Sequence, residues 1–165
     1  MTHPGKTQPI LVPVDFSPYS EAALSCAIDM AETLGAPLTV LHVVHDLAEA
    51  PGYYAVKGRK KELQRLEDLA AEMLHDYIEQ MQKKQPERQA LKKAATMLVA
   101  GLPVSRILET AEKIDARMII MGSQGRTGLA HVMLGSKAEQ VVRLSPIPVL
   151  IVKADKKTAS AKNND

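Results

Sequence analysis

The chain has 165 residues, a length that suits one domain built around one hydrophobic core. Hydrophobic residues make up 45% of the chain and aromatic residues only 3%, so the core must consist mainly of aliphatic side chains. The net charge is only +2, and aromatic side chains for stacking on bases are scarce, which argues against nucleic acid as a partner.

The single cysteine, Cys26, allows no disulfide within the chain. The N-terminal residues show no signal-peptide pattern, and no segment approaches the roughly 18–20 apolar residues that span a bilayer. We therefore expect a cytoplasmic protein that does not insert into membranes.

The first half of the chain predicts two strands and two helices. Residues 10–14 form an apolar run, and Ser17-Pro18 is a favourable N-cap and first helical residue for a helix that Gly35 would end. A second buried strand is expected over 38–44. A loop to Gly58, containing Tyr53 and Tyr54, precedes a helix over 59–84 whose apolar stripe comprises Leu63, Leu66, Leu69, Ala70, Met73, Leu74, Tyr77, Ile78 and Met81.

The second half continues the alternation of strands and helices. Strands are expected over 94–100, 117–121 and 149–152, a turn over 101–103, and helices over 104–114 and 135–144. Strands that alternate with helices predict a parallel sheet, with ligands outside the carboxyl ends of its strands. We expect one domain over 9–153, a short N-terminal tail over 1–8 and a disordered polar tail over 154–165.

The glycine-rich segment after the fourth strand is the strongest candidate for a binding site. Gly122 and Gly125 could take positive φ and let backbone N–H groups approach a ligand, while Gly135 and Ser136 open a helix whose unpaired N–H groups favour an anion. Lys137 could add a charge. Taken alone, the glycines could equally form an ordinary turn, and their spacing is neither that of a Walker A loop nor of a dinucleotide fingerprint.

Gly122, Gly125, Gly135 and Ser136 satisfy the spacing G-x2-G-x9-G-[ST], which resembles the nucleotide-binding motif of the universal stress protein family. Further similarities to the family's pattern lie, in the same order, at residues 10–17, 41–44, 101–103 and 146–150. The resemblance covers roughly residues 8–153.

The resemblance implies a Rossmann-like α/β fold: a single-domain, open, parallel five-stranded sheet, strand order 3-2-1-4-5, with helices on both faces. It also implies ATP as the ligand. Asp15 would lie near ribose and phosphates, the backbone of 12–14 and Val43 near adenine, Met121 and Gly122 near ribose, and the remaining residues near the phosphates. The implied set is Val12, Pro13, Val14, Asp15, Val43, Met121, Gly122, Gly125, Arg126, Gly135, Ser136 and Lys137.

Other reactive side chains have simpler interpretations. Asp15 could merely cap the following helix, although with the motif it could also hold Mg²⁺ through water. His42 in an apolar strand and Cys26 on the apolar face of a helix are expected to be structural. His131 falls within the glycine segment and could be exposed to solvent.

The leading hypothesis is an ATP-binding regulatory or stress-response protein with an unidentified protein partner, rather than an enzyme. The alternatives are a slow ATPase, a phosphotransferase that autophosphorylates at Ser136, a binder of AMP or cyclic AMP, and a docking module with an empty site. A homodimer through the apolar edge strand Val149–Val152 is expected, as in the family. Replacing Gly122 and Gly125 with valine should abolish binding and leave the fold intact.

Overall fold

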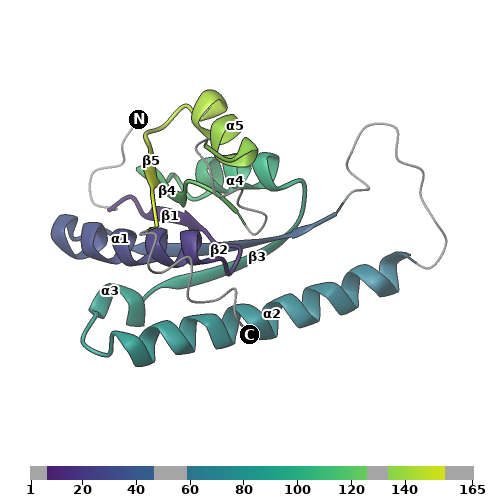
Figure 1. Ribbon diagram of the computed structural model, residues 1–165, viewed down its shortest axis with the longest axis horizontal. Helices are drawn as coiled ribbons and strands as arrows, with labels where there is room; N and C mark the ends of the chain where they lie inside the picture. Colours follow the sequence, from purple (N-terminus) through teal and green to yellow (C-terminus); the bar gives the residue numbers. More distant parts are fainter. Residues whose placement is uncertain (1–6, 47–58, 126–133, 155–165) are drawn as a thin grey trace.

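A computed structural model describes residues 7–46, 59–125 and 134–154 of the chain (Figure 1). Five parallel strands form one sheet in the order β3-β2-β1-β4-β5, which confirms the predicted architecture. The strands are β1 (Ile10–Pro13), β2 (Leu38–His45), β3 (Ala95–Gly101), β4 (Met118–Gly122) and β5 (Val149–Val152). The strand order reverses between β1 and β4, so the switch point of the sheet lies between these two strands.

The helices are α1 (Pro18–Leu34), α2 (Arg59–Lys84), α3 (Gln89–Lys92), α4 (Pro103–Lys113) and α5 (Ser136–Leu144). The expected start and end of α1 are confirmed. Ser17 caps the helix by accepting a hydrogen bond from the N–H of Ser20, at 3.3 Å, and Pro18 is the first helical residue. Gly35 ends the helix with a φ of 58°, in the left-handed region that favours glycine.

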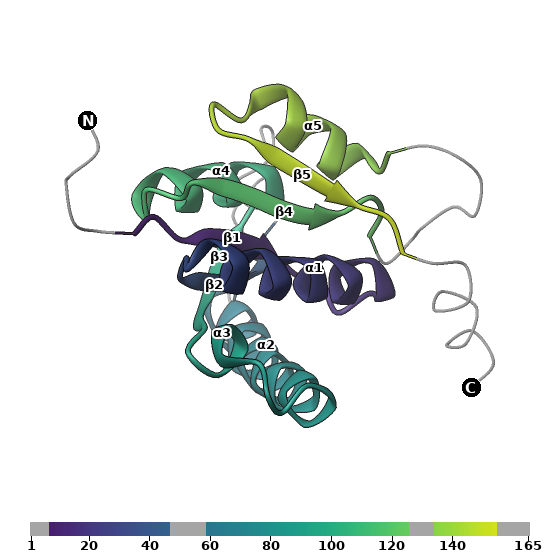
Figure 2. The ribbon, with the colours of Figure 1, turned by 90° about the vertical axis from the view of Figure 1, so that its left-hand side faces the viewer.

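Two apolar clusters occupy the two faces of the sheet. Successive side chains of β1 point to opposite faces of the sheet. Ile10 and Val12 therefore lie in the cluster under α1 and α2, and Leu11 lies in the cluster under α4 and α5. Figure 2 shows these two helical layers on either side of the sheet. Within the described ranges, no helix is both long and apolar enough to cross a membrane.

Several element boundaries differ from those expected. β3 and β4 each begin and end one residue later, β2 extends through His45, and β1 ends at Pro13. The sequence analysis missed α3, because four residues are too few to show helical periodicity. The expected loop with Tyr53 and Tyr54, and most of both expected tails, lie outside the described residues.

The apolar stripe of α2 is not buried along its whole length. Ala70, Leu74, Tyr77 and Met81 are buried against the sheet and α1, but Leu66, Leu69 and Met73 are exposed. Cys26 is half-buried on α1 rather than fully within the core, and the surrounding apolar atoms and Asp29 raise the pKa of its thiol.

Candidate functional site

The candidate site lies at the carboxyl ends of β1 and β4, the two strands on either side of the switch point. Asp15 follows β1, and Ser123, Gln124 and Gly125 form a turn after β4. The turn is fixed to the sheet by the N–H of Ser123, which donates to the carbonyl of Val152 at 2.9 Å. Residues more than 100 positions apart in the chain therefore meet at one edge of the sheet.

The Asp15 carboxylate is held in a defined orientation. Its Oδ1 accepts a hydrogen bond from the N–H of Ser17 at 3.1 Å, and its Oδ2 lies 3.0 Å from where a β-carbon on Gly125 would be. Ser17, not Asp15, caps α1, so the interpretation of Asp15 as a simple helix cap is wrong. One oxygen of the carboxylate orders the loop before α1, while the other approaches the backbone of the glycine turn.

The beginning of α5 packs against the same turn. The N–H of Gly135 donates to the carbonyl of Ser123 at 2.7 Å, and a β-carbon on Gly135 would lie 3.3 Å from the α-carbon of Gln124. Gly135 is the N-cap residue of α5 and offers no side chain to the first N–H groups of the helix. These N–H groups and the positive end of the helix dipole therefore lie beside the turn that contains Gly125, an arrangement that suits an anion.

Gly122 and Gly125 are required because neighbouring atoms lie where a β-carbon would be, not because the backbone is left-handed. The expectation of positive φ at Gly122 and Gly125 is wrong, because among the described glycines only Gly35 and Gly101 have it. A β-carbon on Gly122 would lie 2.8 Å from the backbone of Tyr19 in α1. The expectation that valine at this position would leave the fold intact is therefore also wrong, since Gly122 permits contact between β4 and α1.

The expected adenine-contacting segment of β1 can contribute mainly through its backbone and Pro13. The side chains of Val12 and Val14 are buried in the cluster under α1 and α2. The N–H of Val14 donates to Leu41 at 2.8 Å, so it is already used by the sheet. Alternation places the half-buried Pro13 on the opposite face, which is the face of Val43 and Met121.

The structure brings together some of the remaining predicted residues. Val43, half-buried, and Met121, 8% exposed, both pack in the cluster under α4 and α5. Ser136 and Lys137 are exposed at the start of α5. Arg126 and His131 lie outside the described residues.

Phe16 is a part of the site that the sequence analysis missed. It has a φ of 65°, which is unfavourable for a bulky side chain, directly between Asp15 and the N-cap Ser17. Its ring packs on His42, with centroids 4.4 Å apart, and edge-on against Tyr77 at 5.4 Å. The loop that presents Asp15 is thus anchored to β2 and α2 by one aromatic side chain.

His42 has the structural role that was predicted for it. Its Nδ1 lies 2.7 Å from the carbonyl oxygen of Val14, and because a carbonyl can only accept, Nδ1 carries the proton. The histidine therefore fixes the end of β1 just before Asp15.

The residues present fit Mg²⁺ only as a partner of bound phosphates. Among the described residues, no group of three or more His, Cys, Asp and Glu side chains is placed to hold a metal ion. Asp15 supplies one carboxylate beside backbone N–H groups that suit phosphate, and Mg²⁺ typically binds one or two carboxylates together with phosphate oxygens and water.

This combination of sheet order, glycine turn and helix start defines a single-domain, Rossmann-like α/β protein with its candidate site at the switch point. The sequence pattern described as the universal stress protein family matches residues 6–153. The chain belongs to this family.

Individual relatives agree with this assignment. The chain is 34% identical over 148 residues to universal stress protein MJ0531 of Methanocaldococcus jannaschii, covering 90% of this chain and 83% of that protein. The structure of UspA from Lactobacillus plantarum superposes with a TM-score of 0.74 at 28% identity, covering 90% of this chain and 99% of that one.

Two more distant structures, each 23% identical, are of nucleotide complexes. A universal stress protein in complex with cAMP has a TM-score of 0.55, with 92% of this chain and all of that one covered. The protein from Archaeoglobus fulgidus in complex with dAMP has a TM-score of 0.51, with coverage of 88% and 98%. At 23% identity, these two similarities show a shared fold.

Proposed function

We propose that this protein binds ATP at the switch point and acts through the bound nucleotide as a regulatory stress-response protein. The observation that carries the proposal is the convergence of Asp15, the Gly125 turn and the beginning of α5 within contact distance. The complexes of related proteins with cAMP and dAMP support an adenine nucleotide as the class of ligand.

The proposed binding mode assigns each part of the nucleotide to a chemically suitable surface. The base contacts the apolar face formed by Pro13 and Val43, and Met121 borders the ribose. The backbone N–H groups of the turn at Gly125 and of the start of α5, with Ser136, bind phosphate oxygens. Arg126, Lys137 and a phosphate-bound Mg²⁺ would neutralise the remaining charge, with Asp15 on the ribose or the ion.

The role we propose is regulatory rather than enzymatic. The Asp15 carboxylate is the candidate base at this site, and its Oδ1 is already engaged by the N–H of Ser17 at 3.1 Å. We expect phosphate release well below about one turnover per second, the lower end of typical enzymes. Steady release above that rate by the purified chain would support the alternative of an ATPase.

Two alternatives concern the same site. Transfer of phosphate to the exposed Ser136 would make the protein an autophosphorylating phosphotransferase, and Ser136→Ala would then remove the incorporated label. Preference for AMP or cyclic AMP would appear as competition against bound ATP. A cytoplasmic location stays a prediction from the sequence.

We also propose a homodimer through β5. Within the described residues β5 pairs with β4 only, and Leu150 is 37% exposed on it. Pairing the free edges of two copies would cover this apolar strand. Leu150→Asp should shift the sedimentation coefficient towards that of a smaller species.

Native mass spectrometry of the purified chain tests the ligand directly. A co-purifying mass equal to ATP, absent from the Gly125→Val variant, is the expected result. Retention of the same mass by that variant would mean that the nucleotide binds elsewhere.

A further inference from the structure

The helix α2 contacts α1 near its C-terminal end and exposes apolar side chains in its N-terminal half. Near its C-terminal end, Lys84 forms an ion pair with Glu21 of α1 at 2.6 Å, and Gln85 just beyond it hydrogen-bonds Ser25 at 3.3 Å. In its N-terminal half Leu66 is 52% exposed, Leu69 is 53% exposed and Met73 is 38% exposed. This part of α2 lies on the side towards which β2 points in Figure 1.

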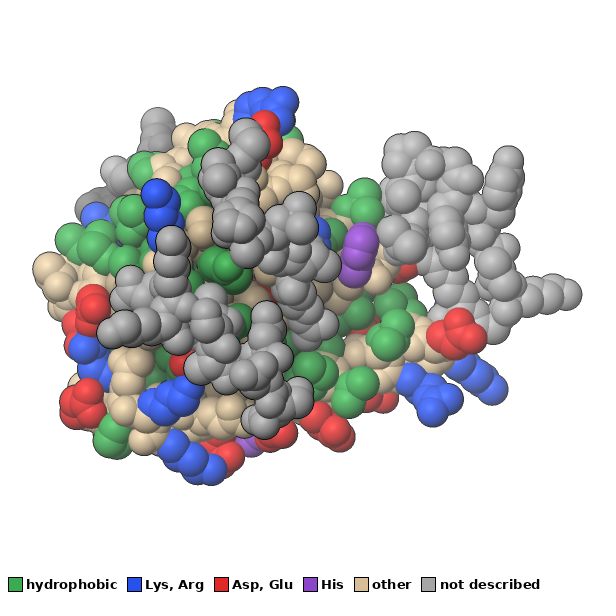
Figure 3. All heavy atoms as spheres, in the orientation of Figure 1, with side chains coloured by type: hydrophobic (Ala, Val, Ile, Leu, Met, Phe, Trp, Pro, Cys, Tyr) green, Lys and Arg blue, Asp and Glu red, His purple; other side chains and the backbone are tan. Residues whose placement is uncertain are grey.

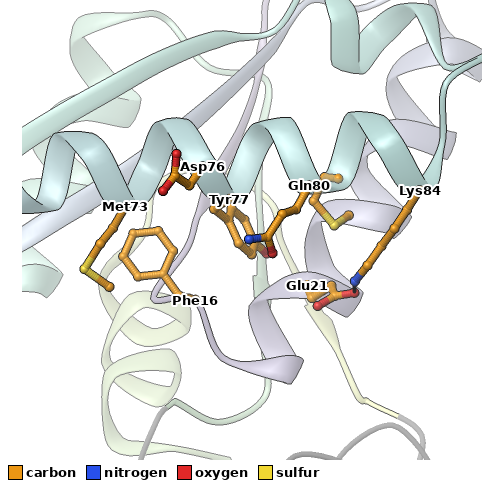
Figure 4. Close-up of a pocket in the computed structure, with 8 residues that line it drawn as sticks. Phe16, Glu21, Met73, Asp76, Tyr77, Gln80 and Lys84 are labelled. Atoms are coloured by element: carbon orange, nitrogen blue, oxygen red, sulfur yellow. Dashed lines mark hydrogen bonds and ion pairs between the residues drawn. The ribbon is translucent and has the colours of Figure 1, made fainter.

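These three side chains form one continuous strip, which we call the α2 strip: Leu66, Leu69 and Met73. Their spacing of three and four residues places them side by side on the helix, next to the line of buried residues. Towards the C-terminal end the same side of α2 borders a pocket of about 280 Å³ against Phe16 and Glu21 (Figure 4). Large apolar side chains grouped on a surface in this way are typical of an interaction site.

The charges along α2 are segregated in a way that an isolated helix would not favour. Lys60, Lys61 and Arg65, with only Glu62 opposing them, precede or flank the strip at its N-terminal end. Positive charge in the first turn is unfavourable, because it faces the positive end of the helix dipole.

The segment that follows is purely acidic apart from His75. It carries Glu67, Asp68, Glu72 and Asp76 without a Lys or Arg. Figure 3 shows hydrophobic side chains along the visible face of α2, with basic ones near its right-hand end and acidic ones below its middle. The basic residues at 60–65 and the acidic residues at 72–76 lie on either side of Leu66 and Leu69, so this charge pattern is self-complementary when the helix is reversed.

We propose that the α2 strip is an interface with a second copy of this chain, in which two α2 helices pair antiparallel about a two-fold axis near residues 68 and 69. In this arrangement Leu66 of each copy packs on Leu69 of the other, and Arg65 lies opposite Glu72. Residues 60–65 of each helix then lie opposite residues 72–77 of its neighbour, which include Glu72 and Asp76.

This interface is separate from the one proposed at β5. The sheet order puts β5 at one edge, whereas α2 packs on β2 and β3 towards the other. Both contacts can therefore form at once, so that a chain with both assembles beyond the dimer. A contact of about two helical turns is small, and we expect it to be weak and concentration-dependent.

Disulfide trapping tests the geometry, using Cys26→Ala as the background so that only introduced cysteines react. Leu69→Cys, nearest the axis, should form a disulfide-linked dimer under mild oxidation. Gln80→Cys, on the same side of the helix, should not, because its two copies would lie about 35 Å apart in an antiparallel pair. Cross-linking of Gln80→Cys in place of Leu69→Cys would overturn the antiparallel arrangement.

Charge reversal tests the interface without cysteines. Sedimentation velocity in a Leu150→Asp background isolates the α2 contact from pairing at β5. Arg65→Glu and Glu72→Arg should each weaken association about tenfold, and the double variant should restore it, since each dimer contains the pair twice. Leu69→Glu should abolish association, with an unchanged circular dichroism spectrum.

The proposal is wrong if association is insensitive to Leu69→Glu or if the double charge reversal fails to restore it. If instead residues of the same chain cover the strip, Leu69→Cys should give no cross-linked dimer and Leu69→Glu should lower the melting temperature. Either result would refute pairing between copies.

Discussion

Gly122 at the end of β4 packs directly on Tyr19 in the first turn of α1, so that a β-carbon on the glycine would lie 2.8 Å from the Tyr19 carbonyl carbon, oxygen and β-carbon. Two of these three atoms belong to the backbone of a helix, which cannot move away cheaply. Gly122→Ala should therefore destabilise the fold by about 1–3 kcal/mol, measured by urea unfolding.

Gly125→Ala provides the matched control for Gly122→Ala. A β-carbon there would meet the Asp15 carboxylate at 3.0 Å, which is the end of a side chain and can move. We expect a smaller loss of stability together with weaker nucleotide binding. Equal losses of stability in the two variants would mean that a β-carbon beside the Tyr19 backbone is no more destabilising than one beside the Asp15 carboxylate.

The positive φ of Phe16 predicts that glycine at this position is more stabilising than alanine, which reverses the usual order. At most positions glycine is less stabilising than alanine, but the φ of 65° at Phe16 is one that glycine adopts freely. Phe16→Gly should therefore be more stable than Phe16→Ala by about 1 kcal/mol. Both variants should be less stable than the parent chain, because each loses the ring contacts with His42 and Tyr77. Thermal unfolding that ranks Phe16→Ala above Phe16→Gly would contradict the left-handed conformation.

Tyr77 predicts how stability changes at alkaline pH. Burial chiefly raises the pKa of its phenol, the negative charges of Glu21 and Asp15 add to this, and the nearby Ser20 hydroxyl opposes it. The hydroxyl is buried without a hydrogen bond of normal geometry to the described residues, so the Ser20 contribution is weak.

Because the phenol ionises more easily in the unfolded chain, Tyr77 leaves stability unchanged below its ordinary pKa of 10.0 and lowers it as pH rises further. The slope expected from this one group is about 1.4 kcal/mol per pH unit. Tyr77→Phe should remove that slope and change stability at neutral pH by less than about 1 kcal/mol. Identical alkaline slopes in urea unfolding of the two chains would refute the burial of this hydroxyl.

His42 should stabilise the end of β1 through its Nδ1–H. His42→Leu leaves the carbonyl of Val14 without this donor, 2.7 Å away in the parent chain, and should cost about 1–2 kcal/mol. His42→Asn can present an amide N–H in a similar position and should cost less. Urea unfolding in which the leucine variant is the more stable of the two would exclude a structural hydrogen bond.

Features encoded by neighbouring residues could be predicted from the sequence. Ser17-Pro18 and Gly35 are local signals for the two ends of α1, and the alternation of strands and helices indicated a parallel sheet. The positions of Asp15 and the glycine turn on neighbouring strands followed from the family's sheet order. The strand ends were displaced by a residue because hydrogen bonding to neighbouring strands, rather than composition, decides where a strand stops.

Features that depend on long-range contacts could not be predicted. The need for glycine at Gly122 arises from Tyr19, about a hundred residues earlier, and was mistaken for a requirement of φ. The left-handed Phe16 has no sequence signal, because aromatic residues rarely adopt that conformation. The periodicity of α2 correctly indicated an amphipathic helix, but only packing shows that Leu66 and Leu69 remain exposed.

Calorimetric titration of ATP into the nucleotide-free chain, beside Gly125→Val, tests the central claim most directly. The account predicts saturable binding at one site per chain, weakened at least tenfold in Gly125→Val. The variant's unfolding transition should remain cooperative, since among the described residues a β-carbon at this position meets the end of the Asp15 side chain rather than backbone. Absence of binding to the parent chain, or equal affinity in the two chains, would contradict a nucleotide site formed by Asp15, Gly125 and the start of α5.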